Sequence, residues 1–529
     1  MKYEEVSVGF ERRLGLFAYI LRRLGALVVI LFGASFLIYN LAAISTDPLE
    51  GLKTSTAQNR EQLIAAATRE LRLDLPPPLR YFLWLRGVLG IFVGNPNFGK
   101  TREQQPVIEA IANAIPTTIR LVIVATIVAL VLGLALGITS ALRQYSRFDY
   151  GMTFVAFLLF SLPIFWVAVL LKQYLAIDFN DFLVTAKISP PWIIGSSILT
   201  GFFWAAVISG ARRRVWMIFS IAFLANSIFL SVISASQWLA YPRLGPIAIF
   251  IFGVGIAFGV TYLSVGLSDR NAIKSNLFIA LIGTMLYFPA QNLLDSTRPR
   301  VGILVLLVAL LISAIAVSFI FARIDRGPII RTSIITSILI GLMILLDQMM
   351  QAWRPYIESD DVNYRPVATI GQSTIWLSDT SFWVRVLDFA MHLVLPTLAL
   401  TLISFAGYVR FSRGTLLDVL NQDYIRTARA KGLTERTVIM RHAFRNTMIP
   451  ISTIMVGDVA GIVGGAIITE RVFAWQGMGT LFNKAITSFD LNLLMGVSIF
   501  LSTLAILANL IADLLYSALD PRIRVGAGK

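Results

Sequence analysis

Cysteine is absent from the 529 residues, and only two histidines occur, His392 and His442. The lack of cysteine excludes thiol catalysis, disulfide bonds and thiolate metal sites, and two histidines so far apart in the chain indicate no metal site. Charged residues are also scarce, at 14% against 57% hydrophobic residues. Because a soluble domain usually carries about 25% charged residues, this composition predicts a membrane protein. We expect neither a metal nor a cofactor on this chain.

The net charge of +15 would suggest a nucleic-acid partner in a soluble protein. Here the basic residues lie in short loops between apolar runs, which is typical of the orientation signals of a polytopic membrane protein. We therefore expect no nucleic-acid partner.

Twelve apolar runs come close to the roughly 20 residues that a spanning helix needs. Six of them form an outer set, three near each end of the chain: Leu24–Ile44, Pro116–Leu142, Tyr150–Leu171, Leu393–Val409, Thr447–Thr469 and Leu491–Ala512. Six more lie between the third and the fourth: Trp192–Ala211, Val215–Ile233, Leu244–Ser268, Ser275–Leu294, Val301–Ala322 and Ile329–Leu346. The fold class is therefore an all-α polytopic membrane protein.

The lysines and arginines of the short loops fit one orientation, with both termini in the cytoplasm. We divide the chain into a cytoplasmic N-terminus (1–23), a first half of three spans (24–180) with an external loop (45–115), an inserted block of about six spans (181–375), and a second half (376–529) with a cytoplasmic loop (410–447). An even number of inserted spans leaves the orientation of the last three unchanged.

The stretch Gly94–Thr101, "GNPNFGKT", matches the phosphate-loop pattern G-x-x-x-x-G-K-[ST]. Its surroundings argue against a nucleotide site, because the chain leads from it into a spanning helix rather than into an alternating β/α domain. The predicted orientation also places it on the side without ATP. We interpret it as a turn in the external loop.

The cytoplasmic stretch Asp423–Pro450, "DYIRTARAKGLTERTVIMRHAFRNTMIP", predicts two short helices. Gly432 suits the C-cap of the first, and Thr434 with Thr437 opens the second, which has an apolar and a basic side. Such a rigid projection suits contact with a partner protein. From composition alone, a basic loop that binds anionic lipid is an equal alternative.

The same stretch resembles the cytoplasmic coupling loop of ABC importer permeases, in particular the B-type permease subunit of the oligopeptide, dipeptide and nickel importers. The similar motifs, in chain order, are Ile20–Arg23, Ser161–Trp166, His392–Pro396, Asp423–Leu433, Arg441–Asn446, Gly464–Gly465, Glu470–Phe473, Gly477–Gly479, Asn509–Tyr516 and Leu519–Arg522. The resemblance covers roughly residues 1–180 and 376–529, and the block between them has no counterpart in it.

The resemblance implies a six-helix type I ABC importer permease core, here with about six additional inserted helices, in a prokaryotic cell membrane. It implies a second permease in a heterodimer, two cytoplasmic ATP-binding subunits that carry the ATP hydrolysis, and an external substrate-binding protein. The residues that it assigns to ATPase coupling are Asp423, Tyr424, Arg426, Thr427, Ala428, Arg429, Ala430, Lys431, Gly432, Leu433, His442, Arg445 and Asn446. The chain itself is then a transport subunit and no enzyme.

Polar groups and helix breakers within the spans are candidates for the transport pathway or for helix packing. Asp458 faces either the pathway or a partner subunit, whereas the glycines Gly461 and Gly465 favour close helix packing. Pro163 predicts a break in the third span. The aromatic residues after the break, Phe165 and Trp166, fit the core better than the pathway.

Two other function classes remain to be weighed. An ion-coupled secondary transporter predicts inverted repeats and several buried carboxylates, and neither is evident in the sequence. An integral-membrane enzyme needs converging catalytic groups, which two histidines and no cysteine do not supply. The substrate, whether peptide, nickel or oligosaccharide, cannot be read from the sequence, and the inserted block could dock a lipid, another subunit or nothing.

Overall fold

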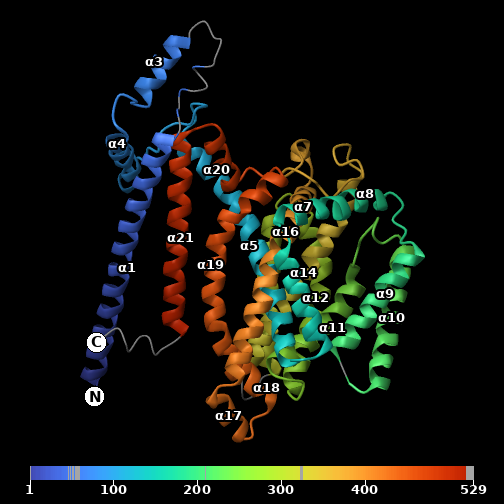
Figure 1. The fold of residues 1–529 in the computed structure, drawn as a ribbon. Helices are drawn as coiled ribbons and strands as arrows, with labels where there is room; N and C mark the ends of the chain where they lie inside the picture. Colours follow the sequence, from blue (N-terminus) through green and yellow to red (C-terminus); the bar gives the residue numbers. More distant parts are fainter. Residues whose placement is uncertain are drawn as a thin grey trace. The chain divides into compact units, whose positions relative to one another are not determined.

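The computed structural model describes residues 2–45, 47, 49, 53, 60–208, 210–321 and 326–519, and within these ranges it describes no side chains for residues 2–23, 70, 378–379, 459–465 and 512–519. The described residues form helices joined by turns, with one isolated β-bridge between Lys100 and Pro106 and no strand (Figure 1). The predicted all-α class is confirmed.

In the part of the chain that the structure describes, ten helices are long and apolar enough to cross a membrane, or eleven spans if a bent helix pair counts as one. The ten are α1 (Lys2–Ser45), α5 (Val107–Leu142), α9 (Pro190–Val207), α10 (Arg212–Ala235), α11 (Gly245–Ser264), α12 (Arg270–Leu294), α13 (Pro299–Phe321), α14 (Arg326–Gln351), α16 (Phe382–Leu420) and α21 (Leu491–Leu519). The remaining predicted span falls in α19 (Phe444–Val472), where the side chains of residues 459–465 lie outside the described set. The total of twelve spans stays a prediction.

Two of these helices extend well beyond the runs that hydropathy predicts. Helix α5 begins at Val107 rather than Pro116, and α16 runs from Phe382 to Leu420 rather than over 393–409. Hydropathy marks the part of a helix that suits the bilayer and not its ends. Most of the predicted loop 410–447 is consequently helical.

The third predicted span is bent by 102° at Pro163, as the sequence predicts. Helix α6 (Arg147–Ser161) ends before Leu162, and α7 (Ile164–Leu171) starts after Pro163, which has extended backbone angles. Proline lacks the N–H that would continue the helical ladder, and it pushes the preceding residue out of the helical region.

The chain divides into two compact units. Unit 1 comprises Met1–Gln173, Thr369–Gln372 and Leu393–Lys529, and unit 2 comprises Tyr174–Ala368 and Ser373–His392. The predicted inserted block, 181–375, falls almost entirely within unit 2, whose boundaries extend beyond it on both sides.

In unit 1, α19 packs against α21, α5 and α7, and α1 packs against α21 and the short helix α4 (Pro77–Leu89). Tyr81 of α4 is fully buried between aromatic rings of α1, with its ring centroid 5.2 Å from that of Phe36 and 5.6 Å from that of Tyr39. Trp84 donates to the Phe98 carbonyl oxygen at 3.2 Å. The aromatic contacts hold α4, in the segment that follows α1, against the C-terminal part of α1.

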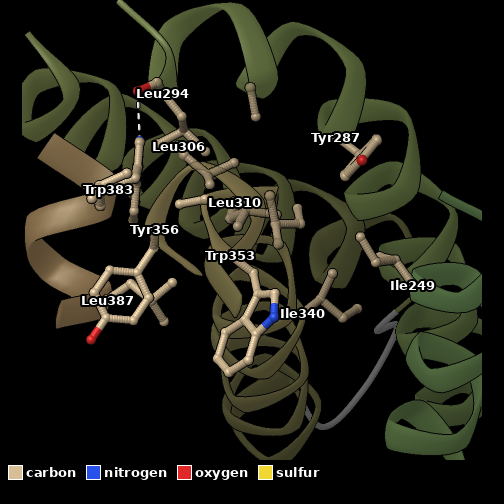
Figure 2. Packing of buried hydrophobic residues seen from close by; sticks show 14 of the residues in the cluster. Ile249, Tyr287, Leu294, Leu306, Leu310, Ile340, Trp353, Tyr356, Trp383 and Leu387 are labelled. Carbon is tan, nitrogen blue, oxygen red and sulfur yellow. Dashed lines mark hydrogen bonds between the residues drawn. The ribbon is translucent and has the colours of Figure 1, made fainter. Parts of the chain in front are cut away.

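In unit 2, α11, α12, α13 and α14 pack against one another around one apolar cluster (Figure 2). Trp383 belongs to this cluster, and its indole N–H donates to the Leu294 carbonyl oxygen at 2.8 Å, the dashed line in Figure 2. Asp347 is fully buried and accepts from the Tyr287 hydroxyl at 2.8 Å and the Leu244 N–H at 2.7 Å. These hydrogen bonds satisfy the buried carboxylate. They also link α14 to α12 and to the start of α11.

Candidate functional site

Helix α17 (Asp423–Ala430) opens the segment that the sequence predicts to be cytoplasmic, and it ends where the sequence predicts. Gly432 has a φ of +74°, its N–H donates to the Arg429 carbonyl oxygen at 2.9 Å, and the Leu433 N–H donates to the Ala428 carbonyl oxygen at 3.4 Å. This pair of bonds is a Schellman cap, which satisfies carbonyls that a helix end leaves free. The predicted cap is confirmed.

The second helix begins at the predicted residue but is not short. The Thr434 hydroxyl accepts from the Thr437 N–H at 3.4 Å, as an N-cap does. From there α18 (Glu435–Thr437), the π-helical turn η4 (Val438–Ala443) and α19 follow without a break. The prediction of two short helices is wrong here, because no glycine or proline stands between Thr434 and Pro450 to end the second one.

One face of the segment Asp423–Asn446, called the 423–446 segment below, is buried in unit 1. Ile425 and Val438 are fully buried. They share one apolar cluster with Ala428, Ala443, Leu416 of α16 and Ala141 of α5. Full burial of a valine or isoleucine side chain contributes about 1.5–3 kcal/mol. The segment is thus fixed to the ends of two spanning helices.

The opposite face is exposed and polar. Arg429 bridges the glycine turn to Glu435, with Nη2–Oε1 at 2.6 Å and Nε–Oε2 at 3.1 Å. This fork of hydrogen bonds from Arg429 lowers the pKa of the Glu435 carboxyl below its ordinary value. Asn446 donates to the Tyr424 hydroxyl at 2.8 Å, which joins the far end of the segment back to α17.

The predicted coupling residues therefore fall into two groups. The structure brings together Arg429 with Glu435 and Tyr424 with Asn446, and it places Asp423 3.5 Å from Arg426. Within the described part of the chain, Lys431, His442 and Arg445 make no ion pair, so their side chains are available to another molecule. The role of the whole set stays a prediction.

Replacing Glu435 by glutamine is expected to raise amide hydrogen exchange at Gly432 and Leu433 by less than about fivefold, because an exposed ion pair contributes at most about 1 kcal/mol. Acidification should lower the protection of the same two amides once exchange is corrected for the intrinsic rate at each pH. The lowered pKa of Glu435 means that the ion pair stabilises the turn above the ordinary carboxyl range and is lost only as the pH falls through the shifted pKa. Exchange measured by mass spectrometry checks both. Glu103→Gln, which breaks the exposed pair with Lys484, is the control. A change above tenfold would show that the ion pair, and not the glycine cap, holds the turn.

Phe165 and Trp166 do not lie in the core of this chain, contrary to the interpretation that the sequence favours. They are 53% and 46% exposed. The 102° bend at Pro163 turns α7 away from α6, and in a bilayer no hydrophobic driving force favours an aromatic side chain that faces protein over one that faces lipid.

The intramembrane candidates on α19 are only partly described. Asp458 is half-buried, and it interacts electrostatically with the Tyr408 phenol of α16. Gly461 and Gly465 belong to α19, but their packing lies outside the described side chains. Close glycine packing is present elsewhere, since a Cβ at Gly133 of α5 would overlap Tyr408.

The stretch GNPNFGKT is a turn in which most backbone donors are already bonded within the loop. The N–H groups of Gly94, Asn95, Asn97 and Thr101 donate to carbonyl oxygens within residues 87–105, and the Gly99 N–H donates to the Asn97 side chain at 2.9 Å. A phosphate loop needs such amides to point at its ligand. The interpretation as a turn is confirmed.

Sequence reasoning missed several buried carboxylates with partners far along the chain, among them Asp347 of unit 2 and two residues of unit 1. Asp149 of α6 is 1% exposed and accepts from Arg413 of α16, Nε–Oδ1 at 2.6 Å and Nη2–Oδ2 at 2.9 Å. Glu470 of α19 is fully buried and accepts from the Thr118 hydroxyl of α5 at 2.6 Å. The motif Glu470–Phe473 could have indicated the role of Glu470. No local pattern indicates the pair of Asp149 and Arg413.

Known proteins share the sequence pattern of this chain. The family described as "Binding-protein-dependent transport system inner membrane component" matches residues 197–525, which is more than half of the chain. The oligopeptide transport system permease protein OppB of Mycobacterium tuberculosis is 45% identical over 143 residues, which are 27% of this chain and 44% of that protein.

Two further relatives agree. The oligopeptide transport system permease protein AppB of Bacillus subtilis is 41% identical over 139 residues (26% of this chain, 44% of that protein), and the dipeptide transport system permease protein DppB of Escherichia coli is 41% identical over 165 residues (31% and 48%). The chain thus spans less than half the length of the curated relatives that it matches. With its apolar helices, the match defines a multi-pass membrane protein, and the chain belongs to the family of binding-protein-dependent transport system inner membrane components.

Proposed function

We propose that this chain is the permease subunit of an ATP-driven importer. It forms the transport pathway with a second permease, most simply as a heterodimer, and receives substrate from an external binding protein. Two cytoplasmic ATPase subunits hydrolyse the ATP and contact the 423–446 segment. Both termini are then cytoplasmic, in a prokaryotic cell membrane.

The observation that carries this proposal is the two-sided character of the 423–446 segment. Its inner face is anchored in the apolar cluster of Ile425 and Val438, and its outer face presents Tyr424, 42% exposed, among unpaired cations. A basic loop that only binds lipid headgroups needs no capped helix, no buried anchor and no ion pair across its turn. A surface that another protein must push needs all three.

The same contacts supply a route for the movement. Helix α17 rests on Leu416 of α16 and Ala141 of α5, and the capped turn at Gly432 connects it to the helix that continues as α19. When the ATPases close on ATP, they displace α17, and three spanning helices receive the displacement as rigid bodies. Charge-assisted contacts from Lys431, His442 and Arg445 hold the ATPase against the segment.

Peptides or similar small solutes are the proposed substrates, since relatives are named for oligopeptide and dipeptide transport. The binding protein makes most of the selection. The chain divides functionally at 1–23, 24–180, 181–375 and 376–529, with the block 181–375 added to the permease core.

Ala428→Arg tests the proposal. Ala428 is 6% exposed and lies in the apolar cluster with Ile425 and Val438. A guanidinium at this position cannot stay in the cluster, so the substitution should displace α17 from its contacts. We expect ATP hydrolysis by the reconstituted transporter to lose its stimulation by substrate, while membrane insertion is unchanged.

Asn421→Arg is the matched control, because it adds the same charge at an exposed position before α17. It should retain most of the stimulation. Full coupling in Ala428→Arg would refute the assignment of the segment.

An ion-coupled transporter is the alternative, and the buried carboxylates argue against it. Glu470 and Asp149 are held by fixed partners near helix ends. Uptake into vesicles that hold an ion gradient but no ATP would separate the two, since the proposed importer should show none.

A further inference from the structure

A pocket of about 800 Å³ lies within unit 1, in the segment that follows α1. Helix α3 (Arg60–Glu70), α4, the loop 97–104 and the beginning of α21 form its walls. One part of the lining is apolar and includes Leu63, Leu83 and Trp84. The pocket belongs to none of the contacts that make up the 423–446 segment.

The rest of the lining is strongly basic. It contains Arg72, Arg80, Arg86, Lys100 and Arg102. The one carboxylate that the lining contributes, Asp490, already accepts from the backbone N–H groups of Arg102 at 2.7 Å and Leu493 at 3.0 Å.

Four of these cations have no acidic partner among the described residues. Among the described residues, Arg72, Arg80, Arg86 and Lys100 take part in no ion pair. The Nε of Arg80 is shielded from solvent and has no hydrogen-bond acceptor in the described structure. A guanidinium N–H without an acceptor, at the wall of a pocket, leaves a donor to which a ligand can bind.

We propose that this pocket binds a short acidic peptide segment, whether a free peptide or part of a longer chain. Arginine pairs with carboxylate through two parallel hydrogen bonds, so a wall of arginines favours ligands with several carboxylates. Pockets of about 300–1,000 Å³ hold ligands of several residues' size, far larger than one phosphate. The apolar wall accommodates the peptide's apolar side chains.

The proposal is independent of the proposed function, because it concerns binding by this chain alone without ATPase or partner. It also gives Lys100 of the GNPNFGKT stretch a role that does not involve nucleotide. In the proposed orientation the pocket faces the external side.

The test is fluorescence anisotropy with the purified full-length chain in detergent and a fluorescein-labelled five-residue probe, Glu-Leu-Glu-Leu-Glu. We expect saturable binding that weakens as salt rises, and at least tenfold weaker binding of a Lys-Leu-Lys-Leu-Lys probe. Arg80→Gln combined with Arg86→Gln should weaken the acidic probe at least tenfold. Each single variant, checked for a monodisperse elution profile, should weaken it less.

Arg60→Gln is the control, since it removes the same charge from an exposed position of α3 that does not line the pocket. Equal binding of both probes, or an equal loss in Arg60→Gln, would overturn the proposal. Full competition by inorganic phosphate at the same concentration as the unlabelled peptide would overturn the peptide assignment. A probe with both ends blocked that binds as well as the free one indicates a segment of a longer chain, whereas dependence on a free C-terminus indicates a free peptide.

Discussion

Substrate-stimulated ATP hydrolysis is expected to fall at least tenfold when Gly432 is replaced by proline. The native φ of +74° is closed to proline, whose ring fixes φ near −65°. Proline also removes the N–H that donates to the Arg429 carbonyl oxygen. The chain then leaves α17 in another direction, and the outer face of the 423–446 segment loses its shape although the membrane helices still insert.

Gly432→Asn tests whether the loss in the proline variant comes from the backbone conformation or from the mere presence of a side chain at residue 432. Asparagine tolerates the left-handed region, and no heavy atom lies within 4 Å of the position that a Cβ would take. This variant should retain most of the stimulation in the same reconstituted assay. If proline at this position couples normally, the segment does not transmit the movement.

Replacing Asp149 by alanine is expected to destabilise the folded chain by about 3 kcal/mol, the low end of the cost of breaking a buried ion pair. Arg413 would lose both of its carboxylate contacts while only 28% of its side chain reaches solvent. Ser140 would lose its acceptor as well. The midpoint of thermal unfolding in detergent, followed by circular dichroism, should fall clearly.

Two further variants test the cause. Asp149→Asn combined with Arg413→Gln removes both charges and should be less destabilising than the sum of the two single changes. Asp418→Asn, on an exposed carboxylate of the same helix α16, should leave the midpoint unchanged. Additive losses in the double variant would mean that the two residues act separately.

Local features could be predicted from the sequence, and distant partners could not. The cap at Gly432, the start at Thr434 and the bend at Pro163 each depend on backbone chemistry within a few residues. Arg413 looked like one more basic residue of a cytoplasmic loop. It proves to lie within α16 and to bind an aspartate 264 residues away, and no local pattern contains that information.

The wrong interpretation of Phe165 and Trp166 has a different cause. Large aromatic side chains indicate a core in a soluble protein because water penalises their exposure. Beside lipid that penalty is absent, so the sequence cannot distinguish a side chain that faces lipid, or a second subunit, from one packed in its own chain.

The unbroken helical path from Glu435 to Val472 is about 57 Å long at 1.5 Å per residue. In the proposed function this path would transmit a displacement along its length. One end carries the exposed surface beside Gly432, and the other carries Glu470, held by Thr118 and by the Thr480 N–H at 2.9 Å. If the proposed ATPases displace the first end, the hydrogen bonds of Glu470 resist the movement of the second.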